Sequence, residues 1–212
     1  MLIAAAAAGL FAASVPPGRV FMSPLPEYLR IVRDNEWRWR ASAWGFAVST
    51  VLMAVGLVIV TSISASRLYG IAAFVVFIVA APCWLGTLAL RLDLTVAAAR
   101  GTVDQAWYDA IGKWSGSLYA IFMVGGHTAV ALLGASFIGR AGIPQWAAWT
   151  TCLLGAFEAL SFWIGWPRVF GMRSLFELPV LVPLVPLFIA IPLALSEFNP
   201  FFGAAAAATA AL

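Results

Sequence analysis

Two ionisable residues, His127 and Glu158, lie deep inside long apolar stretches of the sequence. Counted from the ends of these stretches at Ser117 and Trp146, they lie ten and twelve residues in, which is ~15–18 Å at about 1.5 Å per helical residue. Two neighbouring antiparallel helices would therefore bring both side chains near the middle of a bilayer. Because ionisable groups at that depth are costly and usually face other helices, we predict that His127 and Glu158 contact each other.

Small side chains surround this pair, and such residues allow two helices to approach closely. They recur at three- and four-residue steps, as His127, Ala131, Ala135 and Gly139 on one stretch and as Thr151, Gly155, Glu158, Ser161 and Gly165 on the other. The pattern predicts that the two faces pack together with the polar pair between them.

Three roles are open for the pair. A polar staple would fix helix register, since a hydrogen bond inside a membrane contributes about 1 kcal/mol or less on average. A proton relay or substrate site would use both groups. As a cofactor ligand, His127 is the one histidine of the chain, which excludes a haem held by two histidines but leaves a five-coordinate haem or a chlorophyll-type pigment open. Cys83 and Cys152 have no Cys or His at metal-ligand spacing, so no metal site is predicted.

The elements that must position these residues are membrane helices. Of the 212 residues, 63% are hydrophobic and 10% are charged, whereas a soluble domain has about 25% charged residues. A spanning helix needs ~20 apolar residues, and five blocks have that length: 43–64, 69–90, 117–139, 146–166 and 176–195. The sequence therefore predicts an all-α fold, a polytopic transmembrane helical bundle that forms one domain over residues 1–212.

The number of spans depends on the first apolar block, residues 2–15, which ends at Pro16. As a helix its 14 residues would reach only ~21 Å, short of the ~30 Å hydrocarbon core. Three interpretations are open: a short first span, a signal-like leader that is retained or cleaved, and a partly inserted leader. The predicted bundle accordingly has six spans, or five without this block.

Basic residues predict the orientation. The segments 16–42, 91–116 and 167–175 contain ten of the twelve Lys and Arg residues, and the loops between them contain Arg67 and Arg140. Short loops rich in Lys and Arg stay in the cytoplasm, so we predict that these three segments are cytoplasmic and that the C-terminus lies outside. The composition favours a bacterial inner membrane.

An interfacial amphipathic helix is predicted over residues 24–42. Apolar residues recur there at three- and four-residue steps, while arginines occupy other faces. We expect four side chains to contact lipid headgroups: Arg30, Arg33, Arg38 and Arg40. A helix that binds a partner protein would show the same pattern.

The last apolar block contains four prolines, at 179, 183, 186 and 192. Each proline removes a backbone hydrogen-bond donor, so this helix is predicted to be bent or broken. Broken helices build transport sites, although proline is also common in ordinary spans.

The predicted function is that of a non-catalytic accessory or scaffold subunit, which packs against partner membrane subunits, lipids or pigments. The alternative is a small transporter or proton-coupled carrier that uses Glu158 and His127. An enzyme is the least favoured class, because no phosphate-binding loop, dinucleotide fingerprint or zinc-protease motif is present. The net charge of +3 reflects the loop arginines, so no nucleic-acid partner is predicted.

Overall fold

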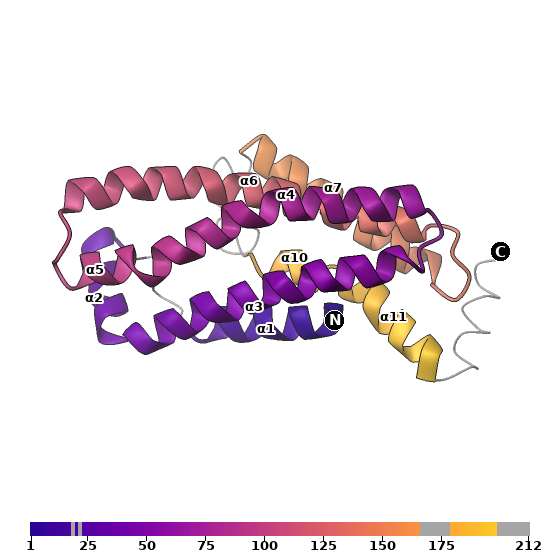
Figure 1. Ribbon diagram of the computed structural model, residues 1–212, viewed down its shortest axis with the longest axis horizontal. Coiled ribbons are helices and arrows are strands. Elements are labelled where there is room, and N and C mark those ends of the chain that lie inside the picture. The colour runs from indigo at the N-terminus through magenta and orange to yellow at the C-terminus, as the bar shows by residue number, and fades with distance from the viewer. Residues whose placement is uncertain (18–19, 21–22, 166–178, 199–212) are drawn as a thin grey trace.

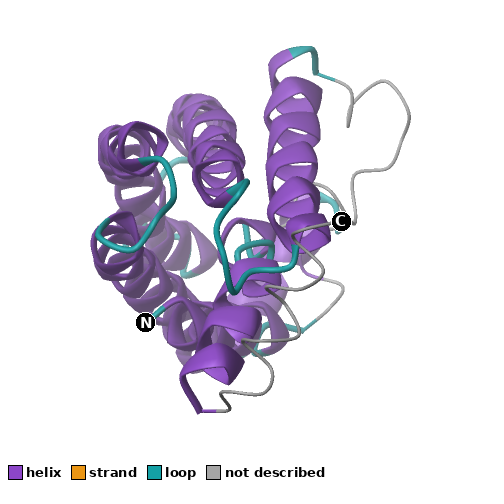
Figure 2. Cartoon of the chain, turned by 90° about the vertical axis from the view of Figure 1, so that its right-hand side faces the viewer, coloured by secondary structure: helices purple, strands orange, loops and turns teal. Residues whose placement is uncertain are grey.

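A computed structural model of the chain describes residues 1–17, 20, 23–165 and 179–198, and this part contains helices and no strand. In chain order the helices are α1 (Leu2–Ser14), α2 (Leu25–Asp34), α3 (Glu36–Thr61), α4 (Arg67–Leu92), α5 (Leu94–Ala99), α6 (Gln105–Phe137), α7 (Gln145–Trp163), α10 (Leu181–Leu184) and α11 (Leu187–Phe198). The longer helices run along the long axis of the molecule (Figure 1), and seen end-on they pack side by side as a bundle (Figure 2). The predicted all-α fold is confirmed.

Among the described residues, three helical runs are long and apolar enough to cross a membrane: α3, the α4–α5 run over Arg67–Ala99, and α6. Helix α7 has 19 residues, and the apolar helices Leu2–Ser14 and Leu181–Ser196 are shorter. These lengths are consistent with an integral membrane protein. Helix α6 begins at Gln105, well before the predicted block, and its 33 residues reach ~50 Å, so its first turns extend beyond a ~30 Å hydrocarbon core.

The first apolar block forms α1, which packs along α3. The hydroxyl groups of Ser42 and Ser49 on α3 each donate a hydrogen bond to a carbonyl oxygen of α1, at 2.7 Å. The two helices approach closely at Gly45, where an added Cβ would lie 2.9 Å from the Cβ of Ala12. The buried residues of α1 recur on one face of the helix: Leu2, Ala5, Ala6, Gly9 and Ala12. In this structure the first block is therefore a helix of the bundle.

The predicted single helix over residues 24–42 is wrong, because the chain turns at Asn35. Helix α2 ends at Asp34, and the side-chain amide of Asn35 donates to the carbonyl oxygen of Ile31 at 3.1 Å. Residues 36–42 instead form the first turns of α3. Helix α2 lies against α5 at the end of the bundle where α3 begins and α4 ends (Figure 1). Two of the basic segments, 16–42 and 91–116, thus meet at one end, which we call the basic end. The third, 167–175, lies outside the described residues.

The proline-rich block is broken, as predicted, over the part that the structure describes. Helix α10 covers four residues, and α11 begins after Pro186 and contains Pro192. Helix α10 lies in the middle of the molecule between α3 and α6 (Figure 1). It touches α6 beside the predicted site, since a Cβ on Gly126 would lie 3.2 Å from the side chain of Val182.

Candidate functional sites

Helices α6 and α7 form a glycine-lined interface at the position of the predicted polar pair. A Cβ added to Gly134 would overlap the backbone of Cys152. A Cβ added to Gly155 would lie 2.8 Å from the carbonyl oxygen of His127. The two predicted small-residue faces therefore do pack together, and the absence of side chains at both glycines permits the contact.

His127 and Glu158 both lie in the buried interior, but no hydrogen bond joins the two side chains. His127 is 0% exposed and Glu158 is 4% exposed. Within the described part of the chain, the two ring nitrogens of His127 have no hydrogen-bond partner. The Oε2 atom of Glu158 has none either. The imidazole instead stacks on Phe162, with the ring centroids 6.3 Å apart and the planes 17° apart. Phe162 follows Glu158 by one helical turn and covers the ring, a contact that sequence reasoning missed.

The surroundings of His127 limit what it could ligate. Its side chain has no exposed surface, and the glycine contacts hold α6 and α7 together next to it and along the following two turns of α6. A porphyrin-type cofactor on His127 would require these helices to separate. Among the described residues, no group of three or more His, Cys, Asp or Glu side chains could hold a metal ion.

The four predicted lipid-contact arginines divide into two groups. Arg30 and Arg33 are 62% and 59% exposed, with Glu27 4.0 Å and Asp34 3.6 Å away. The guanidinium of Arg38 lies 5.4 Å from the ring of its neighbour Trp37. All three of these side chains are exposed on the surface of the described structure.

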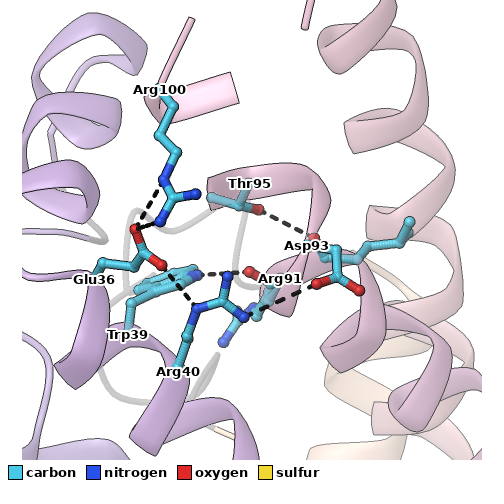
Figure 3. A network of polar contacts seen from close by, with 8 residues as sticks. Glu36, Trp39, Arg40, Arg91, Asp93, Thr95 and Arg100 are labelled. Atoms are coloured by element: carbon cyan, nitrogen blue, oxygen red, sulfur yellow. Dashed lines mark hydrogen bonds and ion pairs between the residues drawn. The ribbon is translucent and has the colours of Figure 1, made fainter. Parts of the chain in front are cut away.

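Arg40 belongs to a partly exposed ion-pair network that joins α3 to α5 (Figure 3). Its Nε donates to Glu36 at 2.9 Å, and its terminal nitrogen lies 3.9 Å from Asp93. Glu36 also accepts two hydrogen bonds from Arg100, at 3.0 and 2.6 Å. The hydrogen bond from Arg40, followed by that from Arg100, lowers the pKa of the Glu36 carboxyl. The network ties the first turn of α3 to the end of α5.

A polar cavity of ≈250 Å³ lies next to this network, and we call it the Arg91 cavity. Its polar lining comes from α2, α4, α5 and α6: Tyr28, Thr87, Arg91, Thr95, Tyr108, Ser115 and Tyr119. Sequence reasoning missed it because these residues are scattered over some ninety positions without a common spacing. The one local signal is Arg91 itself, a charge at the end of an apolar block.

A second hollow, the α6 groove, has a volume of ≈690 Å³ and follows the first half of α6. It is lined by Leu25, Tyr108, Asp109, Gly112, Lys113, Gly116, Ser117 and Ala120. The cavity and the groove share Tyr108, Gly112 and Gly116 on their common edge.

No protein-family model matches the chain, and no curated protein or solved structure matches it. Its function must therefore be inferred from its own geometry and chemistry.

Proposed function

We propose that this chain is a non-catalytic accessory or scaffold subunit of a membrane protein complex, in which it packs against other integral membrane subunits and lipids. In this proposal its apolar helices form five or six spans of a bacterial inner membrane. The basic end faces the cytoplasm and the C-terminus lies outside. The loop arginines support that orientation, because Lys and Arg accumulate on the cytoplasmic side.

The observation that carries the proposal is an uncovered face on the first half of α6. Gly112, Gly116 and Ala120 recur there every four residues. A Cβ added to Gly112 or Gly116 would meet no described atom within 4 Å. Small residues at this spacing allow a helix of another subunit to pack closely where α6 leaves the membrane, as they do between α6 and α7.

The uncovered face continues the one that α7 covers further along α6. Helix α7 ends at Trp163, and its Phe162 lies 6.3 Å from Tyr119, ring centroid to centroid. The turns of α6 before Tyr119 therefore extend past the end of α7, and the α6 groove lies along them. A helix of a partner subunit would fill this groove in the way that α7 fills the next part of the same face.

The test is to fill the groove with side chains of the protein itself. The double variant Ser117→Leu/Ala120→Leu changes two groove residues that do not line the Arg91 cavity. The wild-type chain, purified from its native membrane in mild detergent, is expected to carry a stoichiometric membrane partner, identified by mass spectrometry. The double variant is expected to lose at least most of it.

Ala7→Leu is the matched control, because Ala7 is exposed on α1 and does not line the groove, so this variant should keep the partner. A wild-type chain that purifies alone contradicts the proposal. So does a complex made only of further copies of this chain.

A second candidate, a proton-coupled carrier, is favoured by the buried ring nitrogens of His127 and the Oε2 atom of Glu158, which have no described hydrogen-bond partner. Buried polar atoms without partners are rare in proteins and often have a functional explanation. His127 and Glu158 lie beside the broken α10–α11 segment, which touches α6 at Gly126. In liposomes with a pH-sensitive dye inside, a carrier should move protons in the wild type and lose that flux in Glu158→Gln. Glu27→Gln, at an exposed position, is the control, and equal flux in all three proteins rejects this candidate.

A further inference from the structure

The Arg91 cavity is not used by the proposed function. We propose that it binds the phosphate group of an anionic ligand, with the Arg91 guanidinium as its cationic wall and the surrounding hydroxyl groups as further donors. At ≈250 Å³ it is smaller than the ~300–1,000 Å³ of pockets for drug-sized molecules, and it is partly open. A group the size of a headgroup fits such a space.

Two buried indoles hold the Arg91 guanidinium in position. Its Cζ atom lies 5.4 Å from the ring centroid of Trp39 and 5.4 Å from that of Trp84. Trp39 and Trp84 are 4% and 1% exposed, and the Trp39 Nε1–H donates to the backbone oxygen of Arg91 at 2.9 Å. These two cation–π contacts restrict the position of the guanidinium, whose forked N–H groups suit the oxygens of a phosphate.

Hydroxyl groups supply the remaining donors of the cavity. The Tyr108 hydroxyl donates to Thr95 Oγ1 at 3.4 Å, and Thr95 Oγ1 donates to the backbone oxygen of Leu90 at 3.5 Å, so each hydroxyl would turn to donate to a bound anion. Partial burial raises the pKa of Tyr28 well above its usual range, an effect that Tyr108 reinforces and Arg91 opposes. The Tyr28 phenol therefore stays protonated and can donate to an anion.

The charge balance at this end also favours an anion. The nearby carboxylate of Glu36 is already bound by Arg40 and Arg100, and Asp93 lies near Arg40 with its side chain 89% exposed. Arg91 lies beside this network as a further cation (Figure 3). Hydrogen bonds that involve a charged group are roughly twice as strong as neutral ones, so a phosphate would gain from a guanidinium donor here.

The phosphate could belong to a phospholipid or to a small soluble anion, and the chemistry of the cavity is the same for both. Exposed tryptophans stand near the cavity on α6, at Trp107 and Trp114. Tryptophan is enriched where a bilayer meets water, which is the depth of lipid phosphates. The experiment therefore presents both sources separately.

The test uses the full chain in mild detergent and native mass spectrometry. Phosphatidylglycerol is titrated in one arm, and inorganic phosphate in the other. Wild-type protein is expected to retain one phosphatidylglycerol, one phosphate, or both. Arg91→Gln should weaken that binding by about tenfold or more, because a charge-assisted hydrogen bond is lost. Retention in the lipid arm alone identifies a lipid headgroup, and retention with inorganic phosphate identifies a site that accepts free anions.

Two further variants keep the test decisive if Arg91→Gln disturbs the packing of the indoles. Tyr108→Phe and Thr95→Val each remove one hydroxyl with little change in shape, and each should weaken binding several-fold while the melting temperature stays close to the wild-type value. Arg30→Gln is the matched control at an exposed arginine outside the cavity and should bind as the wild type does. Unchanged binding in Arg91→Gln, Tyr108→Phe and Thr95→Val, or no retention in either arm, overturns the proposal.

Discussion

The middle of the bundle and its basic end both contain polar side chains, but the two regions differ in how far those side chains are buried and hydrogen-bonded. In the middle, His127 and Glu158 are enclosed by close helix packing, with atoms that find no described partner. At the basic end, Glu36, Arg40 and Arg100 are joined by hydrogen bonds, and the cavity beside them is partly open.

The difference shows that burial and polarity have to be weighed together when a site is sought in a small membrane bundle. The sequence draws attention to the middle, because an isolated charge in an apolar block stands out. A cluster of polar side chains that could bind a ligand together lies instead at the basic end, where α2, α4, α5 and α6 line the Arg91 cavity. The following changes test how firmly this contrast holds.

The largest effect is expected where backbone meets backbone. In Gly155→Ala the added Cβ would lie 2.8 Å from the carbonyl oxygen of His127, so α6 and α7 must move apart. We expect a loss of roughly 1–3 kcal/mol of stability, the usual range for overpacking, seen as a lower melting temperature in detergent. Gly86→Ala is the matched control, since its Cβ would have its nearest neighbour at 3.7 Å. A variant at 155 as stable as the one at 86 would mean that the interface is looser than described.

A smaller effect of opposite sign is expected from Glu158→Met. The Oε2 atom of Glu158 has no described partner, and a buried polar atom left unsatisfied costs about 1–3 kcal/mol. Methionine has a similar volume and no such atom, so the melting temperature should rise. A marked fall would show that the carboxyl is bound by a residue outside the described part of the chain, and the contrast between the two regions would then weaken.

The smallest effect is expected at the basic end, from Glu36→Gln. Because Arg40 and Arg100 lower the pKa of Glu36 in the folded protein, the ionised carboxyl stabilises the fold above its usual pKa of 4.5. That contribution is lost as the pH falls through the lowered value. Glu36→Gln should therefore lower the melting temperature slightly at pH 7 and converge with the wild type in acid. Glu27→Gln, whose partner Arg30 is 4.0 Å away, should match the wild type at both pH values.

The sequence predicted the architecture better than the sites. Three patterns that act locally appear in the structure as predicted. An apolar block of spanning length forms α3, and the glycine and alanine stripes form the α6–α7 interface. The prolines of the last block coincide with the break between α10 and α11. The predicted contact between His127 and Glu158 depends on side-chain direction as well as depth. Both residues lie at the α6–α7 interface, but the side chain that contacts the imidazole of His127 is Phe162, whose ring stacks on it.

What the sequence by itself determined is whatever follows from period and composition: an all-helical chain, its apolar blocks, and the gathering of two basic segments at one end. The tertiary structure decided three things that no local pattern contains. Helix α2 packs against α5; Arg100 pairs with Glu36; and the guanidinium of Arg91 lies over the ring of Trp39 beside a cavity. The physical reason is that these contacts join residues far apart in the chain, 64 positions in the case of Glu36 and Arg100, and only the packing of the helices brings them within reach of one another.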